Sequence, residues 1–344
     1  MATSPDRTTG EPRDLTAHLM DQAMGHLFSA ALRTAAQHGI ADRLAEGPRT
    51  AEQLAAATGT HAPHLRRVLR YLATRGIFRE DTAGAFQLTP AAALLRTGVP
   101  DSLHDGVMMM TDDLFRRTSA DLPEAVREGG TSFERLYGAP LFTHLQSDPD
   151  GRRLFDDGMS SLSAPVDEAV AAVYPFPATG ATVVDVGGGR GGLLRAVLRR
   201  HPQLTGVLFD QAPPLAHHLL DGDELKGRWR IQEGDFFTSV PEGGDVYVLK
   251  QVLHDWPDDA CRRILRSCRQ AMAAGGRLLV IDSVLPPGNA PHFGKTLDVA
   301  MMAVVDGKER TAEEFATLLS AEGFRLTRVL PTSAFPSIVD AVAE

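Results

Sequence analysis

A glycine-rich stretch in the middle of the chain could form a ligand-binding turn. DVGGGRGG, at positions 185–192, lies between an apolar run and a helical pattern. Glycine is needed where a turn is tight or a ligand approaches the backbone closely, and Gly187, Gly189 and Gly192 satisfy the G-x-G-x-x-G spacing of dinucleotide sites. Asp210 ends the next apolar run, where a carboxylate accepts hydrogen bonds from ribose hydroxyls. The pattern therefore predicts a ligand that contains adenosine, and it fits NAD and S-adenosylmethionine equally well.

Three further stretches distinguish between these two ligands. They are EGDFF at positions 233–237, LKQVLHDW at 249–256 and GKERT at 307–311. Together with DVGGGRGG, and in this order, they resemble the motifs of S-adenosylmethionine-dependent small-molecule O-methyltransferases. That family comprises the plant caffeate and flavonoid enzymes and their bacterial polyketide and antibiotic-tailoring relatives. The resemblance covers nearly the whole chain. It implies methyl transfer to a hydroxyl of a small, aromatic or polyketide-type secondary metabolite, with S-adenosyl-L-homocysteine as product.

The resemblance also implies an acid–base group. His254 matches the general base of the family, and Glu309 matches a glutamate that flanks it. Asp282 falls at the second flanking position, where plant members usually carry Glu; its side chain is one methylene shorter, which can keep it from reaching the imidazole. His254 follows the end of a predicted strand, and open α/β sheets bind their ligands at the carboxyl ends of the strands.

A set of cofactor-binding residues follows from the same resemblance. Asp235 would bond the amino group of adenine, and Phe236 would cover its ring. Lys250 lies just before the histidine segment, and Ser163 matches a position near the methionine carboxylate. The complete predicted set is Asp185, Gly187, Gly189, Asp210, Gly234, Asp235, Phe236, Lys250 and Ser163.

Methionine and phenylalanine side chains could line a flat apolar pocket for the acceptor. A methionine stripe is usually part of a core, but the resemblance places substrate-contacting methionines at Met159 and Met301. Phe155 joins these two as a predicted acceptor contact. The residues left open between core and pocket are Met108, Met109, Met110, Met302 and Phe142.

Methyl transfer to a hydroxyl needs help with one proton. A phenol with a pKa of about 10 is neutral at pH 7, and ionising it beforehand would cost about 4 kcal/mol. A histidine can instead take the proton while the new bond forms, and a carboxylate can orient the ring and stabilise the imidazolium. Because the sulfonium already supplies the leaving group, we expect no metal requirement.

The elements that must position these residues form two pattern types. From Ala181 onward, apolar strand patterns alternate with helical patterns, which predicts a doubly wound parallel sheet of seven strands, a Rossmann-like methyltransferase domain over residues 171–344. Residues 101–170 lack strand signals and are predicted to be a helical connector that forms part of the substrate pocket. Residues 1–100 are predicted to form a mainly helical winged-helix dimerisation domain.

The winged-helix prediction rests on the order of elements behind a polar tail (1–13), predicted to be disordered. A long helical pattern from Leu15 to His38 is followed by a helix capped at Thr50 and a second helix, and then by a hairpin over 77–88. The long helix has more apolar surface than so small a domain can bury. The resemblance implies that this domain makes a homodimer and closes the substrate pocket of the partner.

The composition limits the kinds of partner that the protein is expected to bind. The net charge is −9, with +2 on residues 1–100 and −11 on the rest, which argues against broad nucleic-acid contact by the second part. The sequence has no signal-peptide pattern and no run of about 20 apolar residues, so we expect a cytoplasmic protein without a membrane partner. Cys261 and Cys268, seven apart in a helical pattern, are expected in the core.

Two other functions fit parts of the sequence. A winged-helix DNA-binding regulator would use Arg66, Arg67 and Arg70 on its recognition helix, but it does not explain a complete cofactor-binding unit. An NAD-dependent oxidoreductase would use the glycine-rich turn, but it does not explain EGDFF, LKQVLHDW or GKERT.

Overall fold

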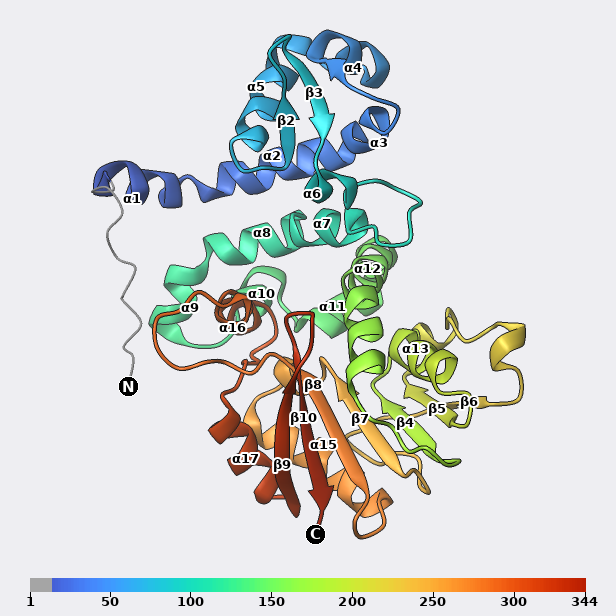
Figure 1. The fold of residues 1–344 in the computed structure, drawn as a ribbon. Coiled ribbons are helices and arrows are strands. Elements are labelled where there is room, and N and C mark those ends of the chain that lie inside the picture. The colour runs from blue at the N-terminus through green and yellow to red at the C-terminus, as the bar shows by residue number, and fades with distance from the viewer. Residues whose placement is uncertain (1–13) are drawn as a thin grey trace, which may run out of the picture. The chain divides into compact units, whose positions relative to one another are not determined.

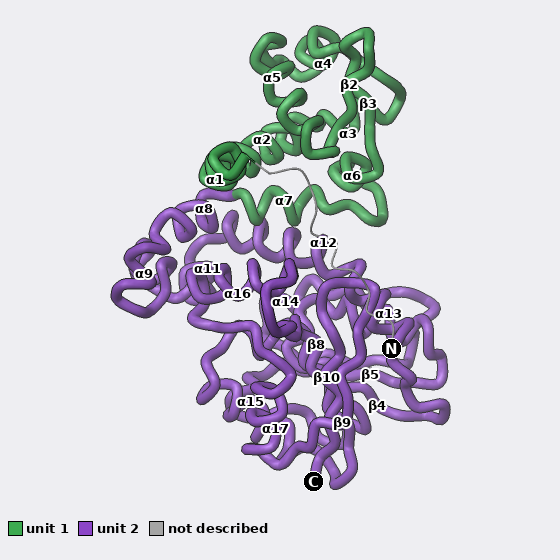
Figure 2. The backbone as a smooth tube through the Cα atoms, turned by 60° about the vertical axis from the view of Figure 1, so that its left-hand side comes forward, with its two compact units in different colours: residues 1–111 green, residues 112–344 purple. Residues whose placement is uncertain are grey.

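The protein divides into two compact units, residues 1–111 and residues 112–344 (Figure 2). A computed structural model describes residues 14–344. The predicted N-terminal tail lies outside the described residues. Each unit is described by itself below.

The first unit has the predicted winged-helix order of elements. Its elements are α1 (Leu15–Ala23), α2 (Gly25–Gln37), α3 (Ile40–Leu44), β1 (Arg49–Thr50), α4 (Ala51–Thr58), α5 (Ala62–Ala73), β2 (Phe78–Glu80), β3 (Ala85–Leu88), α6 (Pro90–Ala93) and α7 (His104–Met110). The side chain of Thr50 caps α4 in a capping box with Gln53, and Gly59 ends the helix with a φ of +68°. The hairpin of β2 and β3 pairs with β1 to complete a small sheet.

The single long helix predicted from Leu15 to His38 is wrong in one respect. The chain leaves helical geometry at Met24, with φ −92° and ψ 11°, and a second helix begins at Gly25. Glycine is a poor helix former. The apolar periodicity of the sequence therefore continues past Met24 and Gly25, although the helix is interrupted there.

Helices α5 and α1 of this unit differ in how far their apolar side chains are buried. α5 buries Leu65, Leu69 and Leu72 in the core, whereas α1 buries no residue, and Leu15 and Leu19 are 77% and 65% exposed. The exposed apolar side chains on α1 and its continuation are Leu15, Leu19, Met20, Met24 and Leu27.

The arginines of the predicted recognition helix are partly engaged within the unit. Arg66 and Arg70 form ion pairs with Glu80 of β2, at 3.5 Å and 3.0 Å. Two of the three cations that a DNA-binding function would use therefore already face a carboxylate.

The second unit begins with helices and continues into a sheet. The helices before the sheet are α8 (Asp113–Ala120), α9 (Leu122–Glu128), α10 (Ser132–Tyr137), α11 (Leu141–Ser147) and α12 (Pro149–Val173). The strands are β4 (Thr182–Val186), β5 (Thr205–Asp210), β6 (Trp229–Glu233), β7 (Val246–Lys250), β8 (Arg277–Asp282), β9 (Phe324–Pro331) and β10 (Ser337–Ala343). The remaining elements are α13 (Gly192–Arg200), α14 (Ala212–Leu215), η1 (Asp223–Leu225), η2 (Leu253–Asp255), α15 (Asp258–Ala271), α16 (Phe293–Val304) and α17 (Ala312–Ser320).

The seven strands form one sheet in the order β6-β5-β4-β7-β8-β10-β9 (Figure 1). The first five are parallel, as predicted, but β10 is antiparallel to both β8 and β9. The expectation of a wholly parallel sheet is therefore wrong at this edge. The connection from β9 to β10 spans only residues 332–336, and so short a connection can join only antiparallel neighbours.

The sheet is buried on both faces. Side chains alternate along each strand, so that Val184 packs in a core with α15 and α17, whereas Val183 packs in a second core with α12 and α13. Cys261 and Cys268 lie in the first of these cores, as predicted, and burial raises the pKa of both thiols to about 12. Within residues 14–344, no helix is long and apolar enough to cross a membrane.

Candidate functional site

The turn between β4 and α13 has a backbone that only glycine can follow at several positions. Gly187 and Gly189 have φ values of +67° and +58°, a region that favours glycine. A Cβ atom on Gly187 would lie 2.9 Å from Val252 Cγ2, and one on Gly188 would lie 2.6 Å from Asp185 Cγ. The predicted glycines are therefore required by local geometry.

Asp210 ends β5 directly beside this turn. Its Oδ2 accepts a hydrogen bond from the Gly189 N–H at 2.7 Å, and its Oδ1 accepts one from the Gln211 N–H at 2.6 Å. Burial raises the pKa of this carboxyl group, and the two N–H donors act in the opposite direction. Each oxygen keeps a second lone pair, so the group can still accept hydrogen bonds from the hydroxyls of a ribose.

Asp185 lies beneath the turn and is 1% exposed. Neither carboxylate oxygen makes a hydrogen bond of ordinary geometry with the described residues. Burial raises the pKa of Asp185 to about 7, and Lys250 opposes this rise. A buried carboxyl group without a partner is costly in a part of the structure that only packs, and it fits a turn that binds a polar ligand.

Lys250, at the end of β7, forms a buried ion pair that the sequence analysis missed. Its Nζ donates to Asp167 Oδ1 of α12 at 2.5 Å. A Cβ atom on Gly192 would lie 2.4 Å from Asp167 Oδ2, so the glycine at the start of α13 makes room for this carboxylate. The one sequence signal was an acidic residue within the apolar stripe of a helix.

The EGDFF segment after β6 reaches the same turn. A Cβ atom on Gly187 would lie 3.4 Å from the ring of Phe236, and one on Gly234 would lie 2.5 Å from the ring of Phe209. Asp235 is exposed, and its Oδ1 accepts a hydrogen bond from the Phe237 N–H at 2.9 Å. Ser163 of α12 lies at the end of β7, where its Oγ donates to Gln251 Oε1 at 3.4 Å. Among these four predicted residues, Phe236 and Ser163 lie beside the elements that hold the glycine turn.

His254 lies in η2, after β7, and is 5% exposed. Its Nδ1 lies 2.8 Å from Glu309 Oε1. Because a carboxylate can only accept, Nδ1 carries the proton of this hydrogen bond, and Nε2 is the nitrogen left to receive one. Nε2 lies 3.5 Å from Asp255 Oδ1, a neighbour to which the sequence analysis gave no part in the chemistry.

Three carboxylates determine the charge of this imidazole. Burial alone would lower the pKa of His254, but Asp255, the hydrogen bond to Glu309 and the charge of Asp282 together raise it to about 10. The sequence alone does not predict this rise in the pKa of His254, because the carboxylates come from three separate segments of the chain.

Asp282, at the end of β8, acts on His254 through its charge alone. It is 1% exposed, and neither oxygen has a hydrogen-bond partner among residues 14–344. Burial raises its pKa to about 7, and His254 opposes the rise. The shorter side chain of aspartate therefore leaves the imidazole to Glu309.

Comparisons with known proteins identify the family of this chain. Residues 119–325 match the model of the O-methyltransferase domain, and residues 20–98 match that of the O-methyltransferase dimerisation domain. The chain belongs to the O-methyltransferase family. It is an S-adenosylmethionine-dependent enzyme, and the residues at the glycine turn fit that cofactor: glycines with positive φ, a carboxylate beside them and an aromatic ring next to Gly187.

The relatives of this O-methyltransferase include bacterial small-molecule methyltransferases. It is 43% identical to the phenazine O-methyltransferase PhzM of Lysobacter antibioticus, over 95% of this chain and 96% of that protein. It is 40% identical to the mitomycin biosynthesis 6-O-methyltransferase of Streptomyces lavendulae, over 92% and 91%. The crystal structure of CalO1, a methyltransferase in calicheamicin biosynthesis, in its S-adenosylhomocysteine-bound form, superposes with a TM-score of 0.90 at 45% identity, covering 97% of this chain and 100% of that one.

Aromatic side chains connect Phe155, which is predicted to contact the acceptor, with the segment that carries His254. Phe155 of α12 contacts Phe142 of α11 edge to face, with ring centroids 6.0 Å apart, and Phe142 stacks on Trp256 at 6.2 Å. Trp256, two residues after His254, also contacts Phe237 at 4.8 Å. The predicted acceptor residue Phe155 is thus two ring contacts away from the segment that carries the histidine.

The methionines of the O-methyltransferase fall into three groups. Met159 lies one helical turn after Phe155 on α12, and both it and Met301 of α16 are half-buried. Met109 is buried in the first unit, which makes it a core residue. Met110 and Met302 are exposed. The assignment of Met159 and Met301 to the acceptor pocket stays a prediction.

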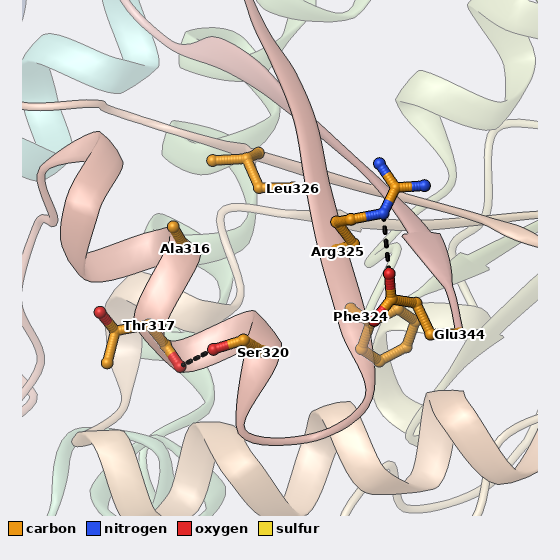
Figure 3. A pocket seen from close by; sticks show the side chains of 7 residues that line it. All are labelled: Ala316, Thr317, Ser320, Phe324, Arg325, Leu326 and Glu344. Carbon is orange, nitrogen blue, oxygen red and sulfur yellow. Dashed lines mark hydrogen bonds and ion pairs between the residues drawn. The ribbon is translucent and has the colours of Figure 1, made fainter.

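An open pocket lies elsewhere on the second unit of the O-methyltransferase, between α17 and β9 (Figure 3). Its lining residues are Ala316, Thr317, Ser320, Phe324, Arg325, Leu326 and Glu344, with an ion pair of 2.7 Å between Arg325 and Glu344. It contains none of the predicted site residues, so we assign it no part in methyl transfer. Across residues 14–344, no three His, Cys, Asp or Glu side chains are grouped as ligands of a metal ion.

Proposed function

We propose that this O-methyltransferase methylates a hydroxyl of a small, aromatic or polyketide-type secondary metabolite, with His254 as general base and without a metal. The observation that carries the proposal is the hydrogen bond from His254 Nδ1 to Glu309. It fixes the tautomer and the orientation of the ring, so that Nε2 can take the proton of the acceptor hydroxyl. The names of the relatives support a secondary metabolite as acceptor.

S-adenosylmethionine supplies the methyl group and its own leaving group. The protein has to bind it, to align the acceptor oxygen and to remove one proton. Asp210 and the glycine turn bind the adenosine part, Phe236 covers the adenine, and Lys250 and Ser163 face the methionine part. Phe155, Met159 and Met301 contact the acceptor.

The charge on His254 determines how the proton moves. Because its pKa is raised to about 10, His254 carries a second proton in most molecules at neutral pH, and it acts as the base in the fraction that has lost the proton from Nε2. Asp255, Asp282 and Glu309 stabilise the imidazolium that results. We expect the rate to rise with pH through a value above that of an ordinary histidine.

We also propose that the enzyme works as a homodimer held by its first unit. The support is the exposed apolar face of α1 and the match to the dimerisation domain over residues 20–98. In this proposal residues 1–100 dimerise, 101–170 form part of the acceptor pocket and 171–344 bind the cofactor. Sedimentation at micromolar concentration should give a dimer, and Leu15→Glu with Leu19→Glu should give a monomer; a wild-type monomer contradicts the proposal.

The direct test of the function is a screen of hydroxylated aromatic acceptors with methyl-labelled S-adenosylmethionine. Each acceptor is paired with its O-methyl ether, which lacks the reacting hydroxyl and serves as the matched control. We expect label in the free phenol only, and the same rate in EDTA as in added magnesium. Loss of activity in EDTA that magnesium restores would contradict the metal-free mechanism, and label in the ether would contradict methylation of that hydroxyl.

A further inference from the structure

The segment 307–311 contacts the turn that carries His254 through its backbone as well as through Glu309. A Cβ atom on Gly307 would lie 1.9 Å from the carbonyl oxygen of His254 and 2.8 Å from the carbonyl carbon of Asp255. The two backbones are therefore in direct contact. The position of the turn depends on where this segment is held.

Arg310 holds the turn from both sides of the histidine. Its guanidinium is 1% exposed. Its Nη1 donates to the carbonyl oxygen of Leu253 at 2.9 Å, and its Nη2 donates to that of Trp256 at 3.0 Å. Leu253 precedes His254 and Trp256 follows it by two residues, so one planar group fixes the backbone on each side of the imidazole.

The guanidinium is itself fixed from the start of α15. Its Nε and Nη2 donate to Asp258 Oδ1 at 3.0 Å and 2.8 Å. Cys261, one turn further along α15, donates its thiol to the same carbonyl oxygens of Leu253 and Trp256, at 3.1 Å and 3.3 Å. The turn is thus enclosed by donors from α15 and from the late segment.

The backbone of Arg310 and Glu309 is fixed from other elements. The Leu285 N–H donates to the carbonyl oxygen of Arg310 at 2.9 Å, just after β8, and the Glu309 N–H donates to Asp298 Oδ1 of α16 at 2.9 Å. Arg310 therefore connects a rigid frame to the turn, and it makes no hydrogen bond to the imidazole itself.

We propose that Arg310 is a positioning residue for His254: its guanidinium orients the imidazole toward the acceptor by fixing the carbonyl groups of Leu253 and Trp256. The proposal rests on the proposed function, because it requires His254 to be the base. A residue that only stabilised the fold would affect every substrate alike. A residue that acts through the base affects most the substrates that need the base.

The test compares Arg310→Lys with Asp258→Asn. Lysine keeps the charge but cannot donate to both carbonyl oxygens from one planar group. Asn at 258 removes the charge that fixes the guanidinium, from a side chain that is 49% exposed. Lys308→Ala is the matched control, since Lys308 also pairs with Asp258, at 3.2 Å, and makes no contact with the carbonyl oxygens of the turn.

The measurements are kcat on a weakly acidic phenol, kcat on a phenol made more acidic by a ring nitro group, and calorimetric affinity for S-adenosylhomocysteine. For Arg310→Lys we expect kcat on the weak acid to fall about 100-fold, the effect of a base misplaced by an ångström, and Asp258→Asn to follow with roughly a tenfold loss. The loss on the acidic phenol should be several times smaller. Cofactor affinity, and the rates of Lys308→Ala, should stay at wild-type values.

A double variant tests whether Arg310 acts through the base. In a His254→Ala background, Arg310→Lys should cause no further loss of kcat, because the interaction it serves is already gone. An equal loss on both phenols, an additive loss in the double variant, or wild-type kcat in a folded Arg310→Lys would overturn the proposal. If Arg310→Lys does not fold, Asp258→Asn decides by the same criteria. Full activity of His254→Ala would instead overturn the proposed function.

Discussion

Two regions at the carboxyl edge of the sheet have similar charges and different construction. At the cofactor region, Lys250 acts on the carboxylates of Asp167 and Asp185, and Arg152 acts on that of Asp210. At the acid–base region, the carboxylates of Asp255, Asp282 and Glu309 act on His254, and the guanidinium of Arg310 also acts on Asp282. The two regions differ in the identity and in the hydrogen-bond partners of their central basic side chains, Lys250 and His254.

The cofactor region holds its cation still, whereas the acid–base region leaves one nitrogen available. Lys250 is paired with Asp167 at 2.5 Å, and both side chains are largely buried. His254 is held at Nδ1 by Glu309 at 2.8 Å, whereas its Nε2 lies at the longer distance of 3.5 Å from Asp255 Oδ1. The first arrangement stabilises a binding turn, and the second can pass a proton.

The largest expected effect on the free energy of unfolding comes from breaking the ion pair of the cofactor region. Lys250→Met leaves Asp167 buried without its partner, and we expect the free energy of unfolding to fall by about 3–5 kcal/mol. Arg153→Met is the control, because its pair with Asp150 is exposed and should be worth about 0–1 kcal/mol. Calorimetric unfolding measures both. Equal losses in the two variants would mean that the pair is not the support of this region.

The next effect concerns cofactor affinity. Asp210→Ala removes a charged acceptor beside the glycine turn, and we expect binding of S-adenosylhomocysteine to weaken by about 1.5–3 kcal/mol, roughly ten- to a hundredfold in Kd. Asp245→Ala is the control: that carboxylate accepts from the Thr182 N–H at the opposite end of β4, at 2.7 Å. Unchanged calorimetric affinity in Asp210→Ala would remove this residue from the site.

A third effect concerns the pH dependence of the free energy of unfolding. In the folded protein His254 binds its proton below about pH 10, whereas an unfolded histidine does so only below about 6.5. The stabilisation is therefore complete below about pH 6.5 and is lost as pH rises to about 10. Urea unfolding between pH 7 and 9 measures this loss. The free energy of unfolding of the wild type should fall by up to about 1.4 kcal/mol more per pH unit than that of His254→Gln. Parallel slopes would contradict the raised pKa.

The two regions also differ in how far the sequence predicts them. The glycine turn could be predicted because the need for positive φ and close approach is local, and the motif lies within eight consecutive positions. The acid–base region is assembled from the ends of β7 and β8 and from the segment before α17. Family motifs, and no local rule, brought His254 and Glu309 together.

What the sequence analysis missed depends on contacts between distant segments. Arg310 looks like one more polar residue before a helix, and Asp167 like an acidic residue on a helix, until their partners 57 and 83 positions away are known. The sequence predicts Asp282 at a position that flanks the histidine, but its lack of a hydrogen bond to His254 depends on one methylene and on the exact end of β8. The reversal of β10 similarly follows from a short connection and not from the strand pattern itself.

The most direct test of the central claim measures kcat of wild type and His254→Ala on a series of phenols of graded acidity. The account predicts a loss of about 10²–10⁴-fold on the least acidic phenol, a smaller loss as acidity increases and unchanged cofactor affinity. The wild-type rate should rise with pH through a value above that of an ordinary histidine, and this rise should be absent in the variant. A folded His254→Ala enzyme that binds cofactor and keeps more than about a tenth of wild-type kcat on the least acidic phenol would contradict the claim.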